Sequence, residues 1–141
     1  MKFLNEQGQE VTLKRAENLP GFEVMLSENT VIESAVNNPF FKGINILQLP
    51  KKLKGFRDNS DLNNLLDPKK VRTGIKLELD DNELAIFSPN IKITDKKLKN
   101  TNFVFGNGEM IEPSFINFSL KNVVLEKGTN IGFLIICNAI L

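Results

Sequence analysis

The C-terminal part of the chain is the feature that most constrains its fold. Residues 125–129 read as a turn, and an almost uninterrupted apolar run follows from Ile131 to Leu141. Successive side chains of a strand point to opposite faces, so a strand that is apolar on both faces has to be covered on both sides. We therefore expect a buried strand here, covered by the rest of the domain or by another copy of the chain.

Alternating apolar and polar residues predict strands along most of the chain. Residues 71–79 alternate strictly and place five side chains on one face: Val71, Thr73, Ile75, Leu77 and Leu79. Residues 83–87 follow a polar turn and are expected to return as the hairpin partner of this strand. Shorter runs of the same kind occur at residues 10–14, 22–26, 30–33, 44–49, 91–94, 102–105 and 115–120.

This spacing of short strands and Asn, Gly or Pro turns predicts an all-β sandwich or barrel. A chain of 141 residues without an internal repeat or a linker is expected to form a single domain over residues 1–141. At most one short helix is predicted, at residues 60–68, where Ser60 could cap the helix and Pro68 would end it.

The helix candidate belongs to an irregular insertion at about residues 37–69. It contains an aromatic pair and a basic cluster that are candidate partner contacts: Phe40, Phe41, Lys51, Lys52 and Arg57. Packing in the core is the favoured alternative for the two phenylalanines, and a solvated loop is the favoured alternative for the basic residues. Binding functions concentrate on loops that a rigid scaffold carries, which makes the insertion the natural place for a partner-specific contact.

The composition excludes several kinds of site. The chain contains no histidine, tyrosine or tryptophan, so acid–base chemistry and metal binding by histidine are absent. Cys137 has no histidine to activate it and reads as a buried small apolar residue. A net charge of +1 argues against a nucleic-acid or membrane binder. We expect no cofactor, no signal peptide, no spanning helix and a cytoplasmic location.

Three segments resemble motifs of the trimeric dUTPase family, which includes the related dCTP deaminases. Residues 20–24 (PGFEV) are similar to the first motif of the family, a strand that contains a metal-site aspartate. Residues 71–77 (VRTGIKL) are similar to the strand between its first two motifs. Residues 125–136 (LEKGTNIGFLII) are similar to its fourth motif. The order and the spacing fit over roughly residues 10–141, apart from the longer insertion.

The resemblance implies a jelly-roll β-barrel that assembles as a homotrimer. Strands near the C-terminus of the family's subunits pack around the threefold axis, which would account for a terminal strand that is apolar on both faces. The side chains of alternate residues in this strand are the expected subunit contacts: Ile131, Phe133, Ile135, Cys137 and Ala139.

The residues that the family uses for catalysis are replaced in this chain. The family activates a water with an aspartate of its third motif, and a tyrosine there stacks on the deoxyribose. The corresponding segment lies near residues 102–118, but no aspartate occurs after Asp95. Glu109 or Glu112 would be the only substitutes for the base. Glu23 would replace the metal-site aspartate, and Phe133 occupies the position of the fourth-motif glutamine.

Two groups that hold phosphates in the family are also missing. The place of the second motif, Pro-Arg-Ser, reads FSPNI at residues 87–91 and carries no positive charge. The Gly-rich C-terminal arm is expected to be absent, because the sequence stops at Leu141. Losing one transition-state donor typically costs about 2.7–4 kcal/mol. The sequence therefore predicts a protein with no enzymatic activity and with no catalytic or metal residues.

Three functions follow from these considerations. The first is a non-enzymatic structural or interaction protein of dUTPase fold, such as a capsid decoration or other accessory protein of a phage or viral particle, with itself and other virion proteins as partners. The second is a nucleotide-binding regulatory or anti-defence protein that uses the inter-subunit pocket without hydrolysis. The third, which the sequence favours least, is an active nucleotide hydrolase.

Overall fold

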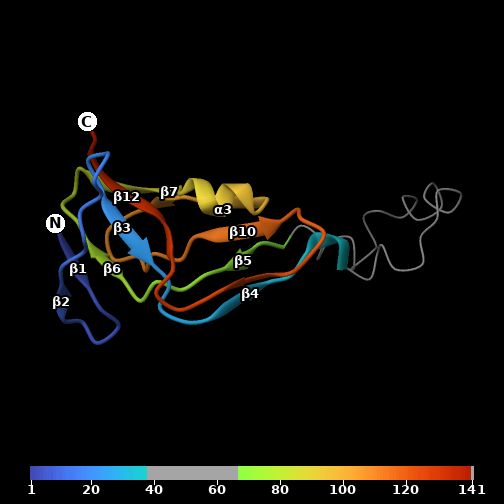
Figure 1. Cartoon of the computed structure of the whole chain (residues 1–141). Helices are drawn as coiled ribbons and strands as arrows, with labels where there is room; N and C mark the ends of the chain where they lie inside the picture. Colours follow the sequence, from blue (N-terminus) through green and yellow to red (C-terminus); the bar gives the residue numbers. More distant parts are fainter. Residues whose placement is uncertain (38–66, 141) are drawn as a thin grey trace, which may run out of the picture.

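The structure is a computed structural model that describes residues 1–37 and 67–140. These residues form short strands, one α-helix and one 3-10 turn, which confirms the all-β prediction (Figure 1). The strands are β1 (Lys2–Leu4), β2 (Glu10–Val11), β3 (Phe22–Met25), β4 (Thr30–Ile32), β5 (Lys69–Lys70), β6 (Lys76–Glu78), β7 (Glu83–Pro89), β8 (Leu98–Asn102), β9 (Val104–Phe105), β10 (Ser114–Asn117), β11 (Val123–Leu125) and β12 (Asn130–Asn138). The 3-10 turn η1 covers Ala35–Asn37, and the helix α3 covers Ile91–Asp95.

Strand β12, which lies where the apolar C-terminal run predicts a strand, is an interior strand of the largest described sheet. The four strands of this sheet follow the order β3-β12-β7-β9, and β12 pairs antiparallel with both of its neighbours. The remaining strands form three smaller sheets, β2-β1-β6, β5-β10-β8 and β11-β4. Residues 132–134 of β12 pair with a strand on each side, and residues 135–138 pair with β7.

The predicted hairpin of residues 71–79 with residues 83–87 is wrong. Strand β6 pairs with β1, where Leu77 lies opposite Phe3, and β7 instead pairs with β12 and β9. Gly74 adopts a φ of 71°, which interrupts the extended segment before β6 and changes the direction of the chain. The inward face is nevertheless as predicted: Val71, Thr73, Leu77 and Leu79 are buried, and Ile75 packs against them.

The helix α3 replaces the strand that alternation at residues 91–94 predicts. The side chain of Asn90 accepts a hydrogen bond from the Ile93 amide, which caps the first turn. Ile93 is buried in the core, but Ile91 is largely exposed. Ile91 and Ile93 therefore do not share one face of a strand. The N-cap formed by Asn90 favours a helix at these residues.

The core lies between the sheets and joins residues from most strands. Its largest fully buried side chains include Phe87, Phe115, Ile32, Leu77, Ile131 and Leu134. Buried polar groups have partners: the Thr73 hydroxyl donates to the Ile111 carbonyl, and the Asn117 amide donates to the carbonyls of Ile32 and Lys121. Among the described residues, no buried side-chain nitrogen or oxygen lacks a hydrogen-bond partner, as a stable fold requires.

The predicted insertion lies mostly outside the described residues. This applies to the candidate partner contacts Phe40, Phe41, Lys51, Lys52 and Arg57, and to residues 60–66 of the predicted helix. Asp67 and Pro68, at the end of that helix, are exposed and not helical. Within the two described ranges, no helix has the length and apolar character needed to cross a membrane.

Candidate functional site

Strand β12 brings three distant motif positions into one row. Phe133 lies opposite Glu23 of β3 on one side and opposite Ser88 of β7 on the other. Residues in register on neighbouring strands share a face, so the three side chains project from the same side of the sheet. We call these residues the Glu23–Phe133–Ser88 row. They come from the segments that resemble the first, fourth and second motifs of the family.

Glu23 supplies a carboxylate at one end of the row. Its side chain is mostly buried, and its Oε2 atom lies 3.6 Å from the Lys14 ammonium. The Glu23 amide also donates to the Lys14 carbonyl at 2.8 Å, so the backbone keeps the two residues together. Lys14 is well exposed, and so the ion pair leaves a positive charge accessible beside the row.

Gly132 and Asn130 shape the backbone at the start of β12. The Asn130 side chain accepts a hydrogen bond from the Gly132 amide, where the pairing of β12 with β3 shifts its register. A Cβ atom at position 132 would overlap the Ser88 carbonyl oxygen and the Phe87 ring. Only glycine therefore lets β12 approach β7 closely enough to place Phe133 beside Ser88.

Asn90 connects the helix to the same end of β12. Its Nδ2 donates to the Asn130 carbonyl at 2.7 Å, and its backbone amide donates to the Ile131 carbonyl. The same side chain caps α3, so one amide group fixes both elements. Neither Asn90 nor Asn130 was predicted from the sequence; an asparagine after Ser-Pro and before a short apolar run was the available N-cap signal.

The predicted subunit contacts occupy two different environments. Ile131 is fully buried in the core of the chain itself, which removes it from the face offered to another copy. The register shift at residues 130–132 accounts for this, because it breaks the strict alternation on which the prediction relied. Phe133, Ile135, Cys137 and Ala139 are only half-buried, and their role as subunit contacts stays a prediction.

Glu109 and Glu112 are separate from the row within one chain. Glu109 lies in the turn after β9, where its Oε2 accepts a hydrogen bond from the Gly106 amide at 2.8 Å. Its backbone carbonyl accepts from the Leu77 amide, which ties this turn to β6. Glu112 is half-buried two residues before β10. Neither is paired with β3, β7 or β12, the strands that carry the row.

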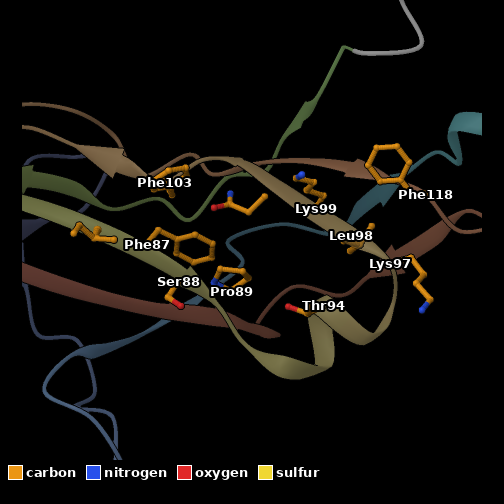
Figure 2. A pocket seen from close by; sticks show the side chains of 11 residues that line it. Phe87, Ser88, Pro89, Thr94, Lys97, Leu98, Lys99, Phe103 and Phe118 are labelled. Atoms are coloured by element: carbon orange, nitrogen blue, oxygen red, sulfur yellow. The ribbon is translucent and has the colours of Figure 1, made fainter.

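A groove of about 580 Å³ begins at the Ser88 end of the row. It runs between β7, the helix α3 and the strand β8 (Figure 2). Two aromatic rings, Phe103 and Phe118, lie toward its opposite ends, and Lys99 lies between them (Figure 2). The remaining lining residues are Ile86, Phe87, Pro89, Thr94, Lys97, Leu98 and Asn100. Lys97 and Lys99 are its charged residues, so the groove favours an anion.

A dedicated metal centre is not built by the described residues of one chain. In residues 1–37 and 67–140, no three histidine, cysteine, aspartate or glutamate side chains gather as a metal site. Glu23 is the carboxylate of the row, and one carboxylate is typical of a site where Mg²⁺ keeps several waters and also binds substrate phosphates.

Comparisons with known proteins identify the fold. No protein-family model matches the chain, and no curated protein matches it. Among solved structures, the dUTPase of Streptococcus mutans aligns over 100% of this chain and 98% of its own, with a TM-score of 0.64 and 17% identity. The EIAV dUTPase aligns over 98% of this chain and 88% of its own, with a TM-score of 0.63 and 13% identity.

A phage enzyme gives a similar match. The D95N mutant of the dUTPase from phage phi11 of S. aureus covers 93% of this chain and 85% of its own, with a TM-score of 0.63 and 8% identity. The chain therefore has the dUTPase fold, as the three motif-like segments indicate.

These matches contradict the expectation of a protein without enzymatic activity. The structures that align with nearly the whole chain are dUTPases, which are enzymes. The expectation relied on the loss of particular side chains from known motifs. That loss removes one set of catalytic groups, but the segment in the place of the third motif contains two other carboxylates, those of Glu109 and Glu112.

Proposed function

We propose that the protein is a nucleotide phosphohydrolase of the dUTPase type that acts at the Glu23–Phe133–Ser88 row. The observation that carries the proposal is the alignment of nearly the whole chain with dUTPases. The row supports it, because the segments similar to three separate motifs converge on one face of the sheet around β12. The substrate class is a nucleoside triphosphate, cleaved between its α and β phosphates.

The proposed chemistry requires a base that activates water. A glutamate carboxylate can remove a proton from water as an aspartate does, and Glu109 is our candidate. Its Oε2 accepts the hydrogen bond from the Gly106 amide, which orients the carboxylate so that its second oxygen can accept a proton from water. Glu23 would hold Mg²⁺, because a carboxylate oxygen is the kind of ligand this ion prefers, and the ion would supply positive charge for the phosphates.

The site is proposed to be completed by a second copy of the chain. The dUTPases of this fold are homotrimers, which supports self-association. Glu109 and the row lie on different parts of one chain, whereas the turn of a neighbouring copy could reach the row. The outer face of β12 is a suitable contact, since Ile135 lies in register with Ile86 and Cys137 with Leu84. This face is apolar, as the interface of a permanent oligomer usually is.

Pyrophosphate release tests this proposal. Purified protein with Mg²⁺ is incubated separately with dUTP and the other deoxynucleoside triphosphates, and pyrophosphate is measured. We expect release from at least one substrate and a loss of about 10²-fold or more in Glu109→Gln, the range that general-base catalysis contributes. Glu112→Gln, which makes the same change three residues later, is the matched control and should retain activity.

Two results would contradict the proposal. Absence of pyrophosphate release from every substrate at high protein concentration would exclude the hydrolase. Full activity in Glu109→Gln would exclude this residue as the base.

No observation on the described residues supports the expected role on a viral particle.

A further inference from the structure

We infer that the groove between β7, α3 and β8 holds the nucleotide, with the base on Phe118 and the phosphates between Lys99 and the row. This inference rests on the proposed function for the identity of the ligand. The composition of the groove carries the rest, because its lining includes an exposed aromatic ring, Phe118, a cation, Lys99, and Ser88 of the row (Figure 2).

The charge of the groove suits a triphosphate. The place of the family's arginine motif, residues 87–91, contains no cation, yet a triphosphate needs positive charge. Lys97 and Lys99 line the groove, and none of the described residues that line it is an aspartate or a glutamate. Neither lysine belongs to an ion pair within residues 1–37 and 67–140. A groove lined by charge of one sign concentrates ligands of the opposite sign, so these lysines can supply the missing charge.

The groove also offers exposed aromatic surface. Phe118 is 56% exposed, although a phenylalanine normally lies in the core. Its backbone amide donates to the Lys97 carbonyl, which fixes the ring beside the start of β8. A nucleobase can stack on such a ring without a specific hydrogen bond. The sequence has no tyrosine, and Phe118 provides an aromatic face that a base or sugar can use instead.

The length and position of the groove set the orientation. Strand β8 spans five residues, or about 13 Å between its ends, so the groove suits an extended ligand rather than a compact one. Lys99 lies between the Phe118 and Phe103 rings in Figure 2, and Ser88 lies on β7 at the other side of the groove. With the base on Phe118, the phosphates pass Lys99 and reach the row, where Glu23 would hold the metal. The opposite orientation would place the base at the row and the phosphates away from it.

Binding measurements test the contacts to the base and the contacts to the phosphates separately. The full chain is titrated in a calorimeter with a non-hydrolysable dUTP analogue and, separately, with inorganic tripolyphosphate, both with Mg²⁺. Lys99→Ala should weaken both ligands about tenfold or more, the typical loss of a hydrogen bond to a charged group. Phe118→Ala should weaken the analogue by about fivefold to a hundredfold and leave tripolyphosphate unchanged.

Matched variants complete the design. Lys96→Ala removes the same charge from an exposed residue that does not line the groove, and it should bind both ligands as the wild type does. Phe103→Ala removes the ring at the other end and should change the Kd of the analogue less than twofold. Circular dichroism and thermal melting confirm that each variant is folded; if Phe118→Ala unfolds, Phe118→Leu replaces it, since leucine keeps the volume and loses the aromatic face.

Several outcomes would overturn the inference. These are an unchanged Kd in Lys99→Ala or in the folded Phe118 variant, a stronger effect in Phe103→Ala than at Phe118, and absence of binding to the wild-type protein. Failure of the proposed function is a different result, since pyrophosphate release can be absent while the binding pattern is as expected. Conversely, the wild-type protein could hydrolyse a nucleotide while both groove variants bind the ligands as the wild type does. This result would support the proposed activity and exclude the groove as the nucleotide site.

Discussion

Gly132 lies directly against the carbonyl oxygen of Ser88, with no space for a Cβ atom between them. This contact lets β12 and β7 approach each other at the point where the proposed site begins. The glycine is needed for the close approach and not for an unusual backbone angle, because its φ is outside the positive range.

Gly132→Ala should destabilise the protein by about 1–3 kcal/mol, because the added methyl group has to displace backbone in a packed sheet. Urea unfolding followed by circular dichroism measures this change. Gly106→Ala is the matched control, since a Cβ atom added there would have no neighbour within 4 Å and the φ of Gly106 is not positive. Equal stability of the two variants would contradict the close approach.

Asn90 combines a helix cap with a contact to β12, and the two roles can be separated by substitution. Asn90→Ala should cost about 1–2 kcal/mol, the usual loss for an N-cap, and more if the Asn130 carbonyl is left unpaired. Asn90→Asp keeps an acceptor for the Ile93 amide and loses the donor to Asn130, so its loss should be smaller. If Asn90→Asp is as unstable as Asn90→Ala, the cap contributes little.

The buried face of β12 should dominate the stability of the domain. Leu134 is fully buried, and Leu134→Ala should cost about 2–5 kcal/mol in a denaturant titration. Ile140→Ala removes apolar atoms from a fully exposed residue nearby and should change the stability by less than about 0.5 kcal/mol. A small loss at Leu134 would show that the strand is not part of the core.

The outer face of β12 should mediate self-association. Light scattering at micromolar concentration is expected to give the mass of a trimer for the wild type and a smaller mass for Ile135→Glu, because a buried unpaired charge opposes association. Val31→Glu places the same charge on an exposed residue of β4, on a different sheet, and should remain a trimer. A monomeric wild type would contradict the proposed composite site.

The sequence predicted the strands better than their partners. Alternation identified the inward face of residues 71–79, and the apolar run identified the strand at the C-terminus, because both patterns report burial directly. It could not identify β1 as the partner of β6, since pairing depends on long-range packing, as between Leu77 and Phe3. It also misjudged residues 91–94, where a cap from Asn90 outweighs the alternation.

The candidate site was predictable only in part. The positions of Glu23, Ser88 and Phe133 could be assigned from motif-like segments, but only strand register shows that they form one row. The burial of Ile131 follows from a register shift that alternation cannot reveal. The groove was not predicted, because its lining residues come together only through the packing of β7, α3 and β8.

The rate of pyrophosphate release from deoxynucleoside triphosphates with Mg²⁺ tests the central claim most directly. We predict that the wild-type protein releases pyrophosphate from at least one of them at a rate proportional to protein concentration, and that Glu109→Gln, purified in parallel, reduces this rate about 10²-fold or more. Release that does not exceed a protein-free control for any substrate, from a folded and trimeric preparation, would contradict the account.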